Sequence, residues 1–96
     1  MQVKTSELTG PALDWAVAKC EGRENDGTWD ENFSSNWLIG GPLIEREGID
    51  IYQSGVWIAE IGGNKTIEGP TPLIAAMRCY VASTLGDEVD VPEELT

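Results

Sequence analysis

The sequence predicts an α+β fold with an N-terminal helix, an antiparallel meander of three to four strands, a C-terminal helix packed on that sheet, and an acidic tail. Apolar residues recur with helical spacing near both ends of the chain, whereas residues 49–52 alternate as a half-buried strand does. The 96 residues, of which 41% are hydrophobic, are enough for one small domain. We therefore expect a single domain over residues 1–96, with the tail at 86–96.

The first helix is expected to begin after Thr9. This residue is a suitable N-cap, and Pro11 falls in the first turn, where a missing N–H costs little. Gly22 ends the helix after about Glu21. Its apolar face is formed by Leu13, Ala16, Val17 and Cys20.

Residues 22–36 are predicted to form a loop, because Gly, Asn, Asp, Ser and Glu dominate them without a clear period. The segment nevertheless contains Trp29 and Phe33, which are unusual in a purely solvated linker. A loop of this length in a small domain indicates a functional role.

The next apolar segment, residues 37–44, is predicted to be extended. Gly40, Gly41 and Pro42 interrupt it, and such residues are not tolerated in a central strand. We therefore expect a bulge or a kink there, followed by a turn at residues 45–48.

Two strands are then expected at residues 49–52 and 56–61, joined by a hairpin turn in which Gly55 supplies the positive φ. After a turn at residues 62–65, residues 66–68 are predicted to form a short edge strand. These segments make up the meander.

The C-terminal helix has the clearest start signal in the chain. Thr71 is a good N-cap, Pro72 fits the first helical position, and Gly86 supplies the stop after Leu85. Alanines at 75, 76 and 82 favour close approach to a sheet or to another helix. The tail beyond Gly86 is expected to be extended, with three apolar side chains available for docking on the body, namely Val89, Val91 and Leu95.

The net charge of −11 argues against direct nucleic-acid binding, which requires a basic surface. Five acids lie between Glu21 and Glu31 and five more between Asp87 and Glu94. They serve either solubility or the imitation of a nucleic acid. The sequence has neither a run long enough to cross a membrane nor a signal peptide, so a cytoplasmic protein is expected.

Catalysis is not expected. The chain has no histidine, which removes the common nucleophile pairs, the usual proton shuttle and most zinc sites. It also has no phosphate-binding glycine motif and no calcium-loop spacing. Cys20 and Cys79 are interpreted as small buried hydrophobes, and a redox pair would require that their helices lie side by side. No metal or cofactor is expected.

The candidate binding site is the segment around the Gly40-Gly41-Pro42 kink. Exposed N–H groups of Gly40 and Gly41 would receive an anion, and Arg46 would pair with it bidentately. Tryptophan faces would hold a base by stacking, and three tryptophans are candidates: Trp29, Trp37 and Trp57. The alternative is a kinked strand in which the tryptophans fill the core and Arg46 pairs with Glu45 or Glu47.

Arg78 is the second basic residue of interest, because it stands in the middle of the C-terminal helix among apolar neighbours. Two interpretations are open. Its stem lies on the sheet with the head in water, or the residue is a buried or interface anchor.

The chain also resembles a known family. The opening Val3-Lys4-Thr5-Ser6-Glu7-Leu8-Thr9-Gly10-Pro11-Ala12-Leu13-Asp14-Trp15-Ala16-Val17-Ala18-Lys19, the segment from Gly69 to Ser83 and the acids from Asp87 to Glu94 are similar to the NinX-like family of small tailed-phage accessory proteins. The resemblance implies an accessory gene that adjusts or disarms the host, acting in the cytoplasm of the infected bacterium. It implies no mechanism, because the family's function is unknown.

Three functions are therefore considered. The first is a non-enzymatic protein, expected as a homo-oligomer, that sequesters a small nucleotide-like ligand at the Trp/Gly/Arg site. The second is an acidic inhibitor that imitates nucleic acid and occupies a basic host protein. The third is an interaction module that uses Trp15 and the long loop. We favour the first, because a Trp-rich kink beside a rare arginine is harder to explain by solubility than are acid clusters.

Overall fold

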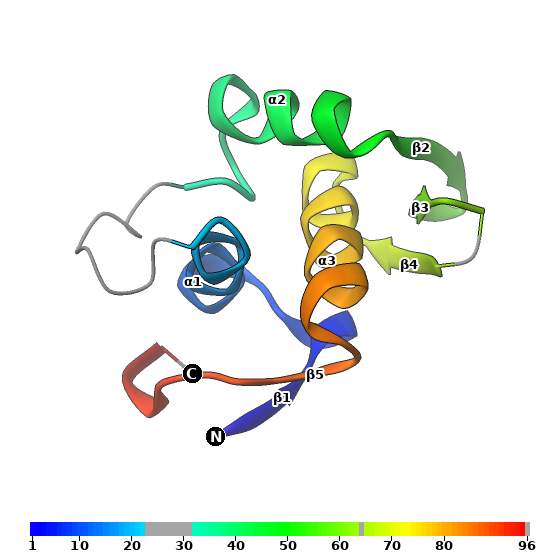
Figure 1. Ribbon diagram of the computed structural model, residues 1–96. Helices are drawn as coiled ribbons and strands as arrows, with labels where there is room; N and C mark the ends of the chain where they lie inside the picture. Colours follow the sequence, from blue (N-terminus) through cyan, green and yellow to red (C-terminus); the bar gives the residue numbers. More distant parts are fainter. Residues whose placement is uncertain (23–31, 64, 96) are drawn as a thin grey trace.

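The computed structural model describes residues 1–22, 32–63 and 65–95. The predicted α+β class is confirmed, with a helix packed on an antiparallel three-stranded sheet (Figure 1). Within these ranges the elements are β1 (Gln2–Lys4), the 3-10 helix η1 (Thr5–Glu7), α1 (Gly10–Cys20), α2 (Trp37–Glu47), β2 (Ile49–Ser54), β3 (Val56–Ile61), β4 (Lys65–Gly69), α3 (Pro72–Leu85), β5 (Glu88–Asp90) and the 3-10 helix η2 (Glu93–Leu95).

Helix α3 lies at the centre of the molecule, with the sheet on one side and α1 on another (Figure 1). Its predicted start is confirmed, because the Thr71 hydroxyl accepts a hydrogen bond from the backbone N–H of Ile74 at 3.1 Å. Small residues let α3 approach the sheet closely. A Cβ atom added to Gly69 would lie 2.5 Å from the backbone nitrogen of Ala75. The alanine spacing and this glycine together allow the backbones of α3 and β4 to come near each other.

The sheet has the order β2-β3-β4, so β3 is central and β4 is an edge strand. Gly55, with φ of 79°, forms the predicted hairpin turn between β2 and β3. The cross-strand register separates two faces. One face packs on α3 and includes Trp57 and Ala59, whereas the other carries Tyr52, Val56 and Ile58.

The extended stretch and kink that the sequence predicts for residues 37–44 are wrong, because these residues form the first part of helix α2. Asn36 caps the helix by accepting from the Leu38 N–H at 3.0 Å, and Gly48 ends it in the left-handed conformation. Pro42 stands inside the helix, where its missing N–H leaves the carbonyl of Leu38 without its helical donor. Leu38 is 83% exposed, so water can reach this side of the helix.

Packing explains why the glycines do not break α2. Gly40 is buried where α2 meets α3, and a Cβ atom there would lie 2.8 Å from the Cδ1 atom of Leu73. Leu43, three residues further along the helix, is buried on the same side. The tertiary contact therefore outweighs the low helix propensity of the glycines.

The two ends of the chain pair as a ribbon that the sequence did not predict. β1 and β5 are antiparallel, with Val3 opposite Val89. The predicted docking of the acidic tail is confirmed, since Val89 and Val91 are buried and Leu95 packs against the core. Thr5 fixes the ribbon to the end of α3, because its buried hydroxyl donates to the Gly86 carbonyl at 2.7 Å.

Most of the predicted long loop, including Trp29, lies outside the described residues. At its described end Phe33 is buried in the core. The Ser34 N–H donates to the Asp14 carboxylate of α1 at 2.8 Å.

The adjacent glycines of α2 give a matched stability test. A Cβ atom at Gly41 meets only the Trp37 ring, at 3.8 Å, whereas one at Gly40 would lie 2.5 Å from the Phe33 carbonyl oxygen. We expect Gly41→Ala to raise the free energy of unfolding by about 0.5–1 kcal/mol through helix propensity. Gly40→Ala should lower it by about 1–3 kcal/mol through the clash. Urea denaturation measures both, and equal effects of the two variants would contradict a helix packed on this side.

Candidate functional site

The glycines of the predicted binding segment do not form an exposed kink. Gly40 is buried against Phe33 and Leu73, and both Gly40 and Gly41 belong to the helical backbone of α2. The anion-binding geometry expected from an extended kink is therefore wrong.

Arg46 is engaged with carboxylates. It binds Glu21 through Nη1 at 3.0 Å and Nη2 at 2.6 Å, and its Nε donates to Glu47 at 2.7 Å. The alternative that paired Arg46 with Glu45 or Glu47 is thus confirmed for Glu47. These bonds raise the pKa of Arg46 above its ordinary value, Glu21 contributing most. Its guanidinium group is therefore already neutralised.

Tyr80 completes this cluster. Its hydroxyl accepts from Arg46 Nη2 at 3.0 Å and donates to Glu21 in a short hydrogen bond. Burial, together with Glu21, raises the pKa of Tyr80 above its ordinary value. The arrangement ties the end of α1 to α2 and α3, which is a structural role.

The tryptophans of the predicted site do not gather around Arg46. Trp37, 53% exposed, begins α2, whereas Arg46 lies in its last turn, about 13 Å further along the axis at 1.5 Å per residue. Trp57 lies on the α3-facing side of β3, packed against the core. Trp29 lies outside the described residues. The structure therefore separates those candidates that it describes.

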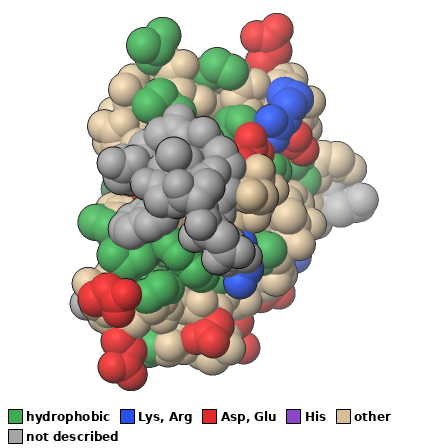
Figure 2. All heavy atoms as spheres, turned by 60° about the vertical axis from the view of Figure 1, so that its left-hand side comes forward, with side chains coloured by type: hydrophobic (Ala, Val, Ile, Leu, Met, Phe, Trp, Pro, Cys, Tyr) green, Lys and Arg blue, Asp and Glu red, His purple; other side chains and the backbone are tan. Residues whose placement is uncertain are grey.

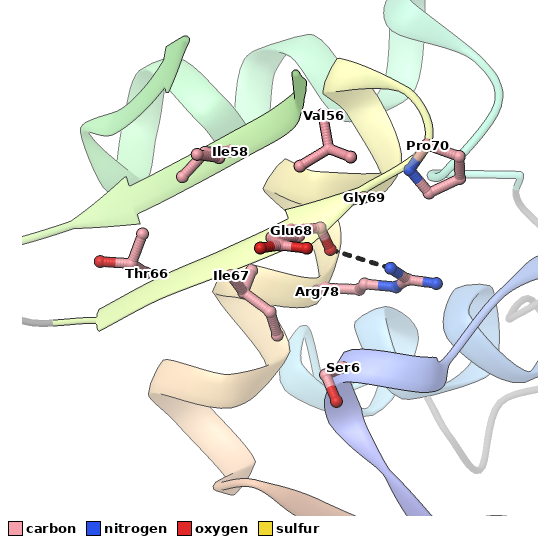
Figure 3. A pocket seen from close by; sticks show the side chains of 9 residues that line it. All are labelled: Ser6, Val56, Ile58, Thr66, Ile67, Glu68, Gly69, Pro70 and Arg78. Atoms are coloured by element: carbon pink, nitrogen blue, oxygen red, sulfur yellow. Dashed lines mark hydrogen bonds between the residues drawn. The ribbon is translucent and has the colours of Figure 1, made fainter. Parts of the chain in front are cut away.

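A hollow of about 720 Å³ lies elsewhere, along the edge strand β4 (Figure 3). Its walls come from β3, β4, η1 and α3, and its volume is in the range of small-molecule sites. The lining residues are Ser6, Val56, Ile58, Thr66, Ile67, Glu68, Gly69, Pro70 and Arg78. The surface thus combines apolar walls, two hydroxyl groups, one carboxylate and one guanidinium group.

Arg78 is the residue that distinguishes this hollow. It is only 8% exposed, so the interpretation that its head lies in water is wrong and the buried anchor is supported. Its Nε donates to the Leu8 carbonyl at 2.8 Å. Its Nη1 donates to the Glu68 carbonyl, also at 2.8 Å (Figure 3). In the described part of the chain no carboxylate forms an ion pair with it, and no hydrogen bond reaches its Nη2 atom.

The electrostatics of Arg78 follow from this burial. Desolvation lowers the pKa of its guanidinium group, and the charge of Glu7 opposes that shift only in part. Arginine nevertheless stays charged at neutral pH. The hollow therefore contains a buried positive charge that is bound by carbonyl dipoles and lacks an anionic partner among the described residues.

The cysteines behave as small hydrophobes. Burial raises the pKa of Cys20 to about 12 and that of Cys79 to about 11, so both thiols remain protonated at neutral pH. Both are free, although α1 and α3 pack together. Within residues 1–22, 32–63 and 65–95, no group of three or more His, Cys, Asp or Glu side chains is arranged to hold a metal ion.

The acidic tail is partly neutralised within the chain. Asp90 pairs with the N-terminal amine at 2.7 Å, which lowers the pKa of its carboxyl group, and Asp87 pairs with Lys65 at 3.1 Å. Figure 2 shows acidic side chains gathered at the lower end of the face drawn. Asp87 and Asp90 of the tail therefore have structural partners.

The fold and the hollow define a small α+β protein with a buried arginine beside the edge of its sheet. The family model "Bacteriophage P22, NinX" matches residues 25–84, more than half of the chain, and the chain belongs to this family of phage accessory proteins. The matched range includes most of α3, which is one of the segments that resemble the family, but not the opening residues 3–19. No match was found among curated proteins.

No helix in the described ranges is long and apolar enough to span a bilayer.

Arg78 and Arg46 give a second stability comparison. Arg78→Met removes two charge-assisted hydrogen bonds and leaves the buried Leu8 carbonyl without a donor, so the free energy of unfolding should fall by about 2–3 kcal/mol. Arg46→Met breaks half-exposed ion pairs and should cost about 1 kcal/mol or less. Chemical denaturation compares the two. A larger loss for Arg46→Met would contradict the anchoring role of Arg78.

Proposed function

We propose that this phage accessory protein acts by binding and not by catalysis, and that it sequesters a small nucleotide-like ligand in the hollow beside β4. An anionic group of the ligand lies on Arg78. This proposal moves the predicted ligand site from the Trp/Gly/Arg46 segment to α3 and β4. The observation that carries it is the buried guanidinium group without an anionic partner among the described residues.

The energetics of Arg78 favour an anionic ligand. A buried charge without a counter-ion is expensive, and its two carbonyl partners supply only partial negative charge. A phosphate or carboxylate oxygen at Nη2 adds a charge-assisted hydrogen bond and supplies the missing charge. The Ser6 hydroxyl, which lines the same hollow, is a further polar group available to the ligand (Figure 3).

The remaining walls suit the body of such a ligand. Val56, Ile58 and Pro70 offer apolar surface, and the Thr66 hydroxyl offers a further hydrogen-bonding group. Val56 is 43% exposed, so this part of the hollow is open to an incoming molecule. The net charge of −11 slows the approach of an anion but does not remove the local attraction of Arg78.

In the infected cell this activity would serve the phage by removing a host signal molecule from the cytoplasm. The host-directed, counter-defence role is part of the proposal, and so is assembly as a homo-oligomer. Native mass spectrometry of the protein purified from bacteria reads the subunit number and any retained ligand in one spectrum.

The test uses two variants of equal charge and similar exposure on the same sheet face. Val56→Glu puts a carboxylate into the hollow, whereas Tyr52→Glu puts one outside it, and the two parent side chains are 43% and 46% exposed. We expect calorimetry with a nucleoside monophosphate panel to detect binding by the wild type and by Tyr52→Glu. Val56→Glu should weaken it at least about tenfold through like-charge repulsion and steric blocking.

Three results would overturn the proposal. One is the absence of binding across the panel together with a ligand-free native mass spectrum. Another is equal affinity of the two variants, which would place any bound nucleotide outside the hollow. If Arg46→Gln abolished nucleotide binding while Val56→Glu bound as well as the wild type, the ligand site would lie at α2 and not in the hollow.

A further inference from the structure

A second hollow, of about 470 Å³, adjoins the first along β4. The two share Ser6, Thr66 and Ile67 as lining residues. The second is lined in addition by Lys65 of β4 and Ala82 of α3. Residues at the paired chain ends complete its lining, namely Lys4, Thr5, Asp87 and Glu88. The two hollows therefore form one continuous surface between the edge strand and the paired chain ends.

Basic side chains concentrate on this surface. Of the Lys and Arg residues that the structure describes, three line it: Arg78 in the first hollow, and Lys4 and Lys65 in the second. In a chain with 17 acids such a concentration is unusual. The surface also contains three acids, Glu68, Asp87 and Glu88, so it is locally neutral within a strongly negative molecule.

Strand β4 sets the spacing of the basic side chains. Lys65 is the first residue of the strand, and Arg78 binds the carbonyl of Glu68, three residues further on. Three residues of strand span about 10 Å. We infer that the ligand carries two anionic groups, one bound by Arg78 and the other by Lys65 with Lys4, at positions about 10 Å apart along β4. This inference rests on the proposed function and extends it.

The Asp87 carboxylate occupies the position inferred for the second anionic group of the ligand. Its carboxylate pairs with Lys65 at 3.1 Å, and the two side chains are 83% and 39% exposed. The Asp87 backbone is fixed separately, because its carbonyl accepts from the Thr5 N–H at 2.8 Å. The carboxylate can therefore rotate away without disturbing the ribbon, and an exposed ion pair of this kind is weak enough for a ligand to replace.

The experiment compares adenosine 5′-monophosphate (pA) with the 5′-phosphorylated dinucleotide pApA by calorimetry. Lys65→Gln is matched by Lys19→Gln on α1, which makes the same charge change away from the hollows. Asp87→Asn is matched by Asp50→Asn on β2. We expect Lys65→Gln to weaken pApA binding by about fivefold and to leave pA within about twofold. Asp87→Asn should strengthen pApA binding by a similar factor.

The outcomes separate this inference from the proposed function. If Val56→Glu weakens pA binding but pApA binds no more tightly than pA, the two-anion inference is overturned and the hollow remains a ligand site. Equal effects of Lys65→Gln and Lys19→Gln on pApA overturn it as well. If neither probe binds the wild type, both the inference and the nucleotide-binding function fall.

Discussion

The Arg78 guanidinium group joins α3 both to the preceding strand β4 and to an N-terminal segment 70 residues away in the sequence. It extends from α3, binds the carbonyl of Leu8 between η1 and α1, and binds the carbonyl of Glu68 on β4. These bonds fix how the N-terminal segment enters α1 and how the sheet meets α3. Because both partners are carbonyl oxygens, they orient the charge without neutralising it. One side chain thus holds the architecture together and leaves a charge at the surface of the hollow.

The same contacts explain how the edge of the sheet is covered. An edge strand such as β4 exposes backbone groups that can pair with another chain. Here Arg78 donates a hydrogen bond to the Glu68 carbonyl of β4, and η1 packs nearby. The glycine and alanine at the contact of β4 with α3 bring the arginine within reach of the strand. Close packing of small residues is therefore a condition for the charged contact.

The parts of the fold that depend on local signals were predictable. The Thr71-Pro72 start of α3, the turn at Gly55 and the end of α1 before Gly22 follow from capping and turn chemistry. In α2, Gly40, Leu43 and Ile44 have helical spacing and Gly48 supplies a helix stop. The general rule that glycine and proline interrupt helices and strands nevertheless led to the prediction of an extended stretch. The β1–β5 ribbon depends on pairing between opposite ends of the chain, which no local pattern reports.

The candidate site was only partly predictable for the same reason. Sequence proximity drew attention to Arg46, whose carboxylate partner Glu21 is 25 residues away and whose contact with Tyr80 depends on the fold. Arg78 was recognised as unusual because an arginine interrupts an apolar helix. Its burial could not be inferred, because α3 is enclosed on several sides by elements whose arrangement is set by tertiary packing. The hollow itself arises between η1, the sheet and α3.

The most direct measurement is NMR of the Arg78 side chain in protein labelled with 15N-arginine, assigned with an Arg78→Lys sample. The account predicts slow exchange of the Nε–H proton and hindered rotation about the Nε–Cζ bond, because Nε and Nη1 are held by carbonyls. When a nucleotide that binds is added, the Nη2 resonance should shift while the Nε–H proton stays protected from exchange with water. A guanidinium group that rotates freely and exchanges as fast as a solvated arginine would contradict the account.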